Sequence, residues 1–328
     1  MPLTGQVRWG IISTANIART AFLPGLRAGG GQPLAVASRN RTHAEHFARA
    51  NGVERAIEGY QNLIDDPDVD ALYIPLPNGL HAEWTIRALQ ARKPVLCEKP
   101  LCGTLADTER VLSAARETGT FLWEALVFPF HAQMEQIRRL LADNAIGELR
   151  EIQSTFQVLL DRPADVRMSR ALEGGAGNDL GCYPVRLARE LFGAEHESAW
   201  ATARWGGDGV DVDIQGSLSF PGGRRLLLSC GFGRSFDAFS RLLGTGGQIH
   251  ISNPFLPGPK DYFDVFAHGA EARRYQARGT EPSFAPAIAH IHAVLRGEQP
   301  PRQLAIDTSL GNATALHDLL MPAAAGGA

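Results

Sequence analysis

Strand-like and helix-like segments alternate through residues 1–124, and this alternation limits the possible folds more than any other feature. Five short runs are apolar and rich in β-branched residues or leucine, at 7–13, 34–39, 71–77, 94–98 and 120–124. Helical periodicity lies between them, most clearly at 80–91 and 105–117. Because the strands are apolar throughout rather than on alternate positions, they predict a parallel sheet covered by helices on both faces.

The pattern changes after Trp123. Apolar and polar residues alternate on both sides of the Pro-Gly-Gly turn at 221–223, which predicts a half-exposed antiparallel hairpin over 210–232. Further strands are expected at 149–159, 199–205, 241–244 and 248–252, and helices at 131–141, 184–192, 285–296 and 309–320. The 328 residues therefore predict an α/β protein of two domains. A doubly wound domain is expected at 1–123 and an α+β domain with a large, mainly antiparallel sheet at 124–328.

Charge and composition exclude several classes of function. Lys and Arg number 32 against 35 Asp and Glu, so the net charge of −3 predicts no surface for nucleic acid or an anionic membrane. No uncharged apolar stretch approaches the ~18 residues that span a bilayer, and the N-terminus does not read as a signal peptide. Because the four cysteines show no CxxC pair and no metal-site spacing, we expect them to be reduced in a cytoplasmic protein.

The turn after the first predicted strand departs from a standard phosphate-binding loop. Dinucleotide-binding Rossmann domains carry GxGxxG or GxGxxA here, whereas this chain has Ser13, Ala15 and Ala18. Small side chains still permit a tight turn and leave helix N-terminal amides to face a pyrophosphate. We therefore expect a dinucleotide to contact Ser13, Thr14, Ala15, Asn16 and Ile17, although this motif alone fits an ordinary strand-turn-helix equally well.

The end of the second strand indicates which dinucleotide is preferred. An NAD-selective site usually places Asp or Glu there to accept from the ribose 2′-hydroxyl, whereas this chain has Ser38 and Arg39. A guanidinium binds a 2′-phosphate in bidentate fashion, and a Ser hydroxyl donates beside it. Ser38 and Arg39 therefore predict NADP(H), with a solvated basic loop as the alternative.

Lys99 is one of only three lysines in a chain with 29 arginines. It follows Glu98 at the carboxyl end of a predicted parallel strand, where ligands bind in such sheets. A compact ammonium group changes its pKa with its surroundings more readily than a guanidinium, which suits a site that handles protons. We expect Lys99 and Glu98 to border the bound dinucleotide.

Leu76, Pro77 and Asn78 end the strand before it and are expected to border the same ligand. Asn78 is of a type that caps helices, and a helix follows it. His81 is either a hydrogen-bonded residue of the first helical turn or part of the cofactor site.

A glycine-rich segment at 174–177 precedes Asn178, Asp179 and Tyr183. The glycines suggest a flexible approach, and Asn178 is a good helix cap. Asp179 and Tyr183 are four residues apart and would share one face of a helix. Pro184 leaves the start of that helix open, because proline donates no backbone hydrogen bond.

These segments resemble the glucose-fructose oxidoreductase, inositol dehydrogenase and MocA family (Gfo/Idh/MocA). The matching segments are WGIISTANIA (9–18), LPNGLHAEWTIRAL (76–89), VLCEKPL (95–101), GGAGNDLGCYPVRLARELFG (174–193) and LLGTGGQIHISNPF (242–255). STANIA, ASR and GCYP look most like the NADP-dependent dimeric dihydrodiol dehydrogenases and D-xylose dehydrogenases. The resemblance implies a Rossmann domain with NADP(H), a homodimer, and a sugar or cyclic diol as substrate.

The resemblance also implies the catalytic residues. The lysine of the family's EKP motif falls on Lys99, the aspartate of DxGxY on Asp179, and the tyrosine on Tyr183. Tyr183 would remove a hydroxyl proton as hydride passes to NADP+, and Asp179 would orient substrate hydroxyls or Lys99. The ammonium of Lys99 would hold the tyrosinate, since at ~4 Å and an effective dielectric of ~20 the attraction is roughly 4 kcal/mol.

One departure leaves the substrate open. The family's segment EAFMYRFHPQ reads EALVFPFHAQ here, so Phe128 and Pro129 replace a tyrosine and an arginine. One alternative function is reduction of an anhydro-ketose or a nucleotide-linked keto sugar. Another is a non-catalytic, dinucleotide-sensing regulator of the Gal80 type.

Two pairs of histidines, His43 with His46 and His290 with His292, are spaced as metal ligands sometimes are. No other residues supply the remaining ligands at a recognisable spacing. We expect no metal site.

Overall fold

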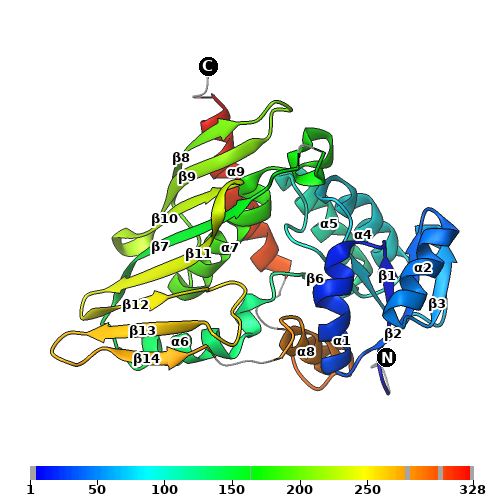
Figure 1. Cartoon of the computed structure of the whole chain (residues 1–328), viewed down its shortest axis with the longest axis horizontal. Helices are drawn as coiled ribbons and strands as arrows, with labels where there is room; N and C mark the ends of the chain where they lie inside the picture. Colours follow the sequence, from blue (N-terminus) through cyan, green and yellow to red (C-terminus); the bar gives the residue numbers. More distant parts are fainter. Residues whose placement is uncertain (1–4, 163, 278–280, 302–305, 326–328) are drawn as a thin grey trace. The chain divides into compact units, whose positions relative to one another are not determined.

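The computed structural model describes residues 5–162, 164–277, 281–301 and 306–325, and its chain forms two compact units (Figure 1). The first comprises Met1–Val127 and Glu281–Leu310, and the second Phe128–Thr280 and Gly311–Ala328. The strands of the first unit are β1 (Arg8–Ile12), β2 (Gln32–Ser38), β3 (Arg55–Glu58), β4 (Ala71–Ile74), β5 (Val95–Cys97) and β6 (Leu122–Glu124). Its helices are α1 (Leu23–Ala28), α2 (Arg41–Asn51), α3 (Tyr60–Ile64), α4 (His81–Gln90), α5 (Leu105–Thr118) and α8 (Ala285–Leu295).

The second unit is built on longer strands. These are β7 (Leu149–Leu159), β8 (Ser198–Trp205), β9 (Asp211–Phe220), β10 (Arg224–Gly231), β11 (Gly233–Gly244), β12 (Gly247–Ile251), β13 (Tyr262–Ala267) and β14 (Arg273–Gln276). Its helices are α6 (Ala132–Ala142) and α7 (Cys182–Phe192), and the division between the units falls within α9 (Ile306–Ala325). No helix in the described ranges has the length and apolar character needed to cross a bilayer.

The six-stranded sheet of the first unit has the order β3-β2-β1-β4-β5-β6, and its neighbouring strands are parallel. This confirms the predicted doubly wound arrangement. The strand order reverses between β1 and β4, and the crevice beyond the carboxyl ends of the strands at such a point is where these sheets bind ligands.

One face of this sheet is covered by α1 and α8. The indole nitrogen of Trp9 on β1 donates to Nε2 of His292 at 2.9 Å, and Nδ1 of His292 lies 3.0 Å from the carbonyl oxygen of Gly29. Phe22 stacks on Tyr73 at 3.8 Å between ring centroids. The contacts of His292 place α8 in the first unit, whereas the sequence predicted that its residues belong to the second domain.

The opposite face is covered by α3, α4 and α5. Its side chains include Ile12, Leu72 and Ile74 from the strands, packed with Leu63 and Val111 from the helices. Strands that are buried on both faces must be apolar at every position, which is why the continuous apolar runs identified them correctly.

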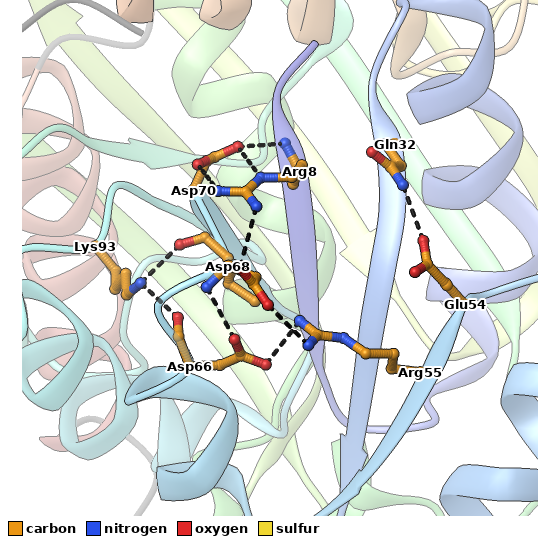
Figure 2. Close-up of polar contacts among 9 residues, drawn as sticks. Arg8, Gln32, Glu54, Arg55, Asp66, Asp68, Asp70 and Lys93 are labelled. Atoms are coloured by element: carbon orange, nitrogen blue, oxygen red, sulfur yellow. Dashed lines mark hydrogen bonds and ion pairs between the residues drawn. The ribbon is translucent and has the colours of Figure 1, made fainter. Parts of the chain in front are cut away.

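A polar network ties together the amino-terminal ends of the strands in this sheet (Figure 2). Arg8 donates to both carboxylate oxygens of Asp70, at 3.0 and 2.9 Å, and Arg55 pairs with Asp66 at 2.8 Å. The ammonium of Lys93 donates to the carbonyl oxygen of Asp66 at 2.7 Å, and burial lowers its pKa. This network lies at the end of the strands away from the ligand crevice, so we assign it to stability.

The eight-stranded sheet of the second unit has the order β14-β13-β12-β11-β7-β10-β9-β8. Its pairings are antiparallel except that of β10 with β7, which confirms the predicted mainly antiparallel sheet. Helices α7 and α9 lie against one face of it. On that face Phe192 of α7 packs on Phe220 of β9, and the Leu319 side chain of α9 approaches Gly216 of β9.

Three strands were not predicted. β3 is a half-exposed edge strand with the sequence RAIE, β14 is the edge strand of the other sheet, and β13 pairs with β14 and β12. β11 begins at Gly233, eight residues before the predicted start. Its first five residues are exposed, so they lack the apolar pattern by which a strand is recognised. Edge strands need no apolar run, so the pattern that marks central strands is weak in them.

Candidate active site

Ser13 determines the backbone conformation of the turn after β1. Its backbone φ is +116°, in the left-handed region that favours glycine, which explains why dinucleotide-binding turns carry glycine here. The Ser13 hydroxyl donates to the carbonyl oxygen of Pro75 at 3.1 Å and accepts from the amide of Ala15 at 3.2 Å. Thr14 and Ala15 are half-buried, and Asn16 and Ile17 are exposed. The backbone that would face a pyrophosphate is therefore accessible.

Ser38 is the last residue of β2 and Arg39 follows it, and the two side chains have different environments. Ser38 is buried and its hydroxyl accepts from the Asn40 amide at 3.3 Å, whereas Arg39 is exposed. Burial raises the pKa of Tyr60, and the guanidinium of Arg39 next to its hydroxyl opposes that rise. Arg39 thus follows the end of β2 directly, and its contact with a 2′-phosphate stays a prediction.

The environment of His81 differs from that predicted for a residue that contacts the cofactor. It is fully buried, with Nδ1 3.0 Å from the carbonyl oxygen of Pro100 and Nε2 2.7 Å from that of Leu76. Both ring nitrogens thus face the backbone, and burial lowers the pKa of His81. The ring joins the segment after β4 to the segment after β5, so we correct its role to one of positioning the cofactor-side loops.

The segment between β4 and α4 also differs in detail. Leu76 is buried and Pro77 half-buried, and Asn78 opens a short 3₁₀ turn over Asn78–Leu80. The residue that caps α4 is Leu80, with no side-chain hydrogen bond, so the prediction that Asn78 caps this helix is wrong.

Lys99 follows β5 and is half-buried. The neighbouring Glu98 carboxylate accepts from the Tyr73 hydroxyl at 2.6 Å and from the Lys99 amide at 3.2 Å. The buried Glu124 carboxylate accepts from the Leu101 amide at 3.0 Å. Two carboxylates therefore hold the backbone on both sides of Lys99, which fixes the point from which its side chain extends.

Asp179 and Tyr183 lie in the second unit, on one helical run. A wide π-helical turn over Gly177–Gly181 leads directly into α7, and Pro184 lies in the first turn of α7. The regular helix therefore starts before Pro184, at a place where proline is tolerated because it lies near the helix start. Asp179 is 3.4 Å from Nη1 of Arg167, which also pairs with Asp165 at 2.9 Å.

The ring of Tyr183 packs among three phenylalanines. Its centroid lies 5.2 Å from those of Phe156 and Phe255 and 6.2 Å from that of Phe128. Phe128, one of the two residues that depart from the family pattern, is thus part of the apolar wall that supports Tyr183. These contacts hold the ring, and the hydroxyl is the one polar group of this side chain that could exchange a proton.

Asp211 was not predicted and is the most unusual carboxylate of this unit. It is 4% exposed, and its Oδ2 accepts from the Gly177 amide at 2.5 Å. Burial raises its pKa to about 7. Strand alternation placed Val210 and Val212 inside and Asp211 outside, whereas all three are buried. The signal that could have found it is the run of glycines at 174–177, which implies a close approach by another group.

Asp211 should make the stability of the protein depend on pH. Its pKa of about 7 lies above the ordinary value of 3.8, so the folded protein keeps a proton that the unfolded chain releases. The free energy of unfolding should therefore fall as the pH rises from about 4 to about 7. Urea titrations at several pH values should show this fall in the wild type and a smaller one in Asp211→Asn. Equal pH dependence in both proteins would contradict the assignment.

The structure thus brings the predicted residues together in two groups. The carboxyl ends of β1, β2, β4 and β5 in the first unit carry the predicted cofactor residues and Lys99. The helical run of the second unit carries Asp179 and Tyr183. Within the described residues, no three His, Cys, Asp or Glu side chains gather as they would around a metal ion, and all four cysteines are buried thiols.

Comparison with known proteins agrees with the fold class. Residues 7–126 match the model of the GFO/IDH/MocA oxidoreductase family with an NAD-binding Rossmann fold, and residues 134–250 match the GFO/IDH/MocA C-terminal domain. The chain belongs to the Gfo/Idh/MocA family. The predicted membership is confirmed, and the protein is an NAD(P)-dependent oxidoreductase that acts on CH–OH or keto groups of sugars.

The similar proteins include reductases of nucleotide-linked sugars. The chain is 38% identical to dTDP-3,4-didehydro-2,6-dideoxy-alpha-D-glucose 3-reductase of Streptomyces violaceoruber, over 86% of this chain and 81% of that protein. A solved structure of KijD10, a 3-ketoreductase from Actinomadura kijaniata, in complex with NADP and TDP-benzene matches with a TM-score of 0.89. It is 31% identical and covers 96% of this chain and 97% of that one. KijD10 variants with a lysine or a tyrosine replaced have also been solved.

Both predicted subfamilies are also represented. D-xylose 1-dehydrogenase (NADP(+)) 2 of Haloferax volcanii is 32% identical over 76% of this chain and 77% of its own length. Trans-1,2-dihydrobenzene-1,2-diol dehydrogenase of Xenopus laevis is 33% identical over 84% and 83%. The keto-sugar reductases match at higher identity, so the comparisons favour the predicted alternative over the predicted main function.

Proposed function

We propose that this protein reduces the keto group of a nucleotide-linked deoxy sugar, with NADPH as the hydride donor. The observation that carries the proposal is the similarity to dTDP-keto-sugar 3-reductases along nearly the whole chain. A second observation supports it. The lysine and the tyrosine replaced in the KijD10 variants stand 84 positions apart, the same separation as between Lys99 and Tyr183.

The residues at the carboxyl ends of β1 and β2 fit NADPH. The turn at residues 14–17, with Asn16 and Ile17 exposed, stands at a helix start and suits a pyrophosphate, and Ser13 supplies the left-handed backbone that the turn needs. The exposed guanidinium of Arg39 suits the 2′-phosphate. Leu76, Pro77, Asn78 and Glu98 remain predicted contacts. When bound, the cofactor supplies the hydride that the carbonyl carbon of the substrate accepts.

Tyr183 then supplies the proton. Its hydroxyl donates to the carbonyl oxygen of the substrate as that oxygen gains charge, and a proton from water restores it afterwards. Lys99, as a point charge, stabilises the phenolate left behind. Asp179, held by Arg167, orients the substrate or the ammonium of Lys99. These three roles require Lys99, Asp179 and Tyr183 to act on the same substrate molecule.

A substrate screen tests the function. Purified protein with NADPH is expected to reduce dTDP-3,4-didehydro-2,6-dideoxy-α-D-glucose, measured by the fall in absorbance of NADPH and by mass spectrometry of the product. D-Xylose with NADP+ serves as the second candidate, because a D-xylose dehydrogenase is among the relatives. Turnover of D-xylose or a dihydrodiol without turnover of any nucleotide-linked keto sugar would overturn the proposal.

Arg39→Ala should reverse or abolish the preference for NADPH. Removing the guanidinium leaves the 2′-phosphate without its bidentate partner, while NADH loses no contact. We expect Kd for NADPH to rise by about tenfold or more, in line with ~1.5–3 kcal/mol for a hydrogen bond to a charged group, and Kd for NADH to stay unchanged. Arg41→Ala is the matched control, because Arg41 is exposed nearby and pairs with Glu45. An unchanged ratio of the two affinities would refute the assignment.

The homodimer implied by the family resemblance stays a prediction. The alternative of a non-catalytic regulator is set aside, because the relatives named above are enzymes.

A further inference from the structure

The carboxylate of Asp211 lies inside the glycine-rich segment that precedes Asp179. Asp211 begins β9, and its Oδ2 accepts from the amide of Gly177, a residue 34 positions away in the chain. The amides of Ala176 and of Asp211 itself also favour the ionised carboxylate. A strand residue therefore holds the start of a helical run that is far from it in sequence.

The glycines at 174–177 make room for this carboxylate. A Cβ atom on Gly175 would stand 2.1 Å from Oδ1 of Asp211, and one on Gly177 would stand 3.2 Å from Oδ2. Gly175 also has φ +113°, which few other residues adopt. The sequence suggested that these glycines give a flexible approach. In the structure these glycines pack directly against the Asp211 carboxylate, which holds the segment in one conformation.

Asp211 takes the place of a local helix cap. Asn178 was the predicted cap, but it lies inside the π-helical turn, and its amide nitrogen donates to the carbonyl oxygen of Glu173 at 3.2 Å. A carboxylate at a helix N-terminus accepts from otherwise unpaired amides and stabilises the helix dipole. Here it comes from the sheet, so the helical run is tied to β9.

The residues of chemical interest follow this anchor at once. The Asp179 amide donates to the carbonyl oxygen of Gly175 at 3.0 Å, so Asp179 lies on the first turn after the anchor. Tyr183 lies one turn further along the same run. A change in the direction of the first turn would move both side chains.

We infer that Asp211 is a positioning residue for catalysis: its buried carboxylate holds the helical run in the orientation in which Asp179 and Tyr183 meet the substrate. The inference rests on the proposed function, which gives Asp179 and Tyr183 their roles. The glycine-rich segment, held by Asp211, then fixes the positions of Asp179 and Tyr183.

Asp211→Asn tests the inference at pH 8, above the pKa of about 7, where the wild-type carboxylate is ionised. Asparagine has nearly the same shape but places either an amide group or a neutral oxygen against the Gly177 amide. We expect kcat for keto-sugar reduction to fall by about 10- to 100-fold, the scale of an ångström-sized misplacement, with Kd for NADPH unchanged. Hydrogen exchange of residues 175–183 should become faster. Rates are referred to the amount of protein that binds NADPH, so loss of folded protein is not counted as loss of turnover.

Asp213→Asn is the matched control. Asp213 lies two residues further along β9 and pairs with Arg234 at 2.7 Å, so the variant removes a carboxylate from the same strand without touching the glycines. It should leave kcat and the exchange of residues 175–183 unchanged. If Asp211→Asn keeps the wild-type kcat, or both variants lose kcat equally, the inference is overturned while the proposed function stands.

Failure of the proposed function gives a different result. In that case the wild-type protein reduces no keto sugar, and the exchange measurement decides about the anchor by itself. Wild-type exchange rates at residues 175–183 in Asp211→Asn would then show that the carboxylate does not hold the run.

Discussion

Tyr183→Phe is expected to lower kcat for keto-sugar reduction by about 10²- to 10⁴-fold, the range for removal of a general acid or base. The substitution deletes one oxygen and leaves the ring, so the packing against Phe128, Phe156 and Phe255 is kept. Kd for NADPH should not change, since the predicted cofactor residues belong to the first unit. Steady-state kinetics and fluorescence titration of NADPH measure the two quantities.

Tyr262→Phe is the control for Tyr183→Phe. Tyr262 lies on β13 with the Arg274 guanidinium 3.7 Å from its ring centroid, so it loses the same oxygen in a different environment. Its kcat should match that of the wild type. Unchanged turnover in Tyr183→Phe would refute the assignment of the proton donor, and some other group would then have to supply the proton.

Lys99→Met is expected to have the second largest effect, a fall in kcat of about 10²- to 10³-fold. The backbone around Lys99 is held by the Glu98 and Glu124 carboxylates through main-chain amides, so the loop should keep its course. What is lost is the positive charge that stabilises a phenolate. Lys99→Arg keeps the charge but spreads it over a planar group, and should recover only part of the rate.

The pH profile gives a second measurement for Lys99→Met. In reduction the tyrosine must hold its proton, so activity falls at the pH where the phenol ionises. Without the ammonium, ionisation becomes harder, so the alkaline midpoint of kcat should move to higher pH. Lys260→Met, at an exposed position, should keep the wild-type profile. An unmoved midpoint in Lys99→Met would separate Lys99 from the proton transfer.

Much of the fold could be predicted because its strands carry their own signal. The central strands β1, β4 and β5 are buried on both faces and must be apolar along their length, and the β9–β10 hairpin alternates because one face is open. The edge strands β3 and β14 lack such a requirement and were missed. The return of α8 to the first unit was also missed, because its apolar residues do not tell which sheet they cover; Trp9 and His292 decide it.

The candidate site divides in the same way. The positions of Lys99, Asp179 and Tyr183 follow from motifs that are short and local, and so does Arg39 at the end of β2. The role of His81 depends on the carbonyl groups of Leu76 and Pro100, which the fold brings to its ring. No local pattern marks such a contact, since backbone carbonyl groups occur at every residue.

The sequence by itself determined the fold class and the family and predicted the candidate side chains for the chemistry, because periodicity and motifs are properties of neighbouring residues. Only the tertiary structure decided what holds those side chains in place. Asp211 and Gly177 are 34 residues apart, and the hydrogen bond between them exists only when β9 lies beside the start of the helical run. Burial and pairing at such distances depend on the packed chain as a whole, so they appear only when it has folded.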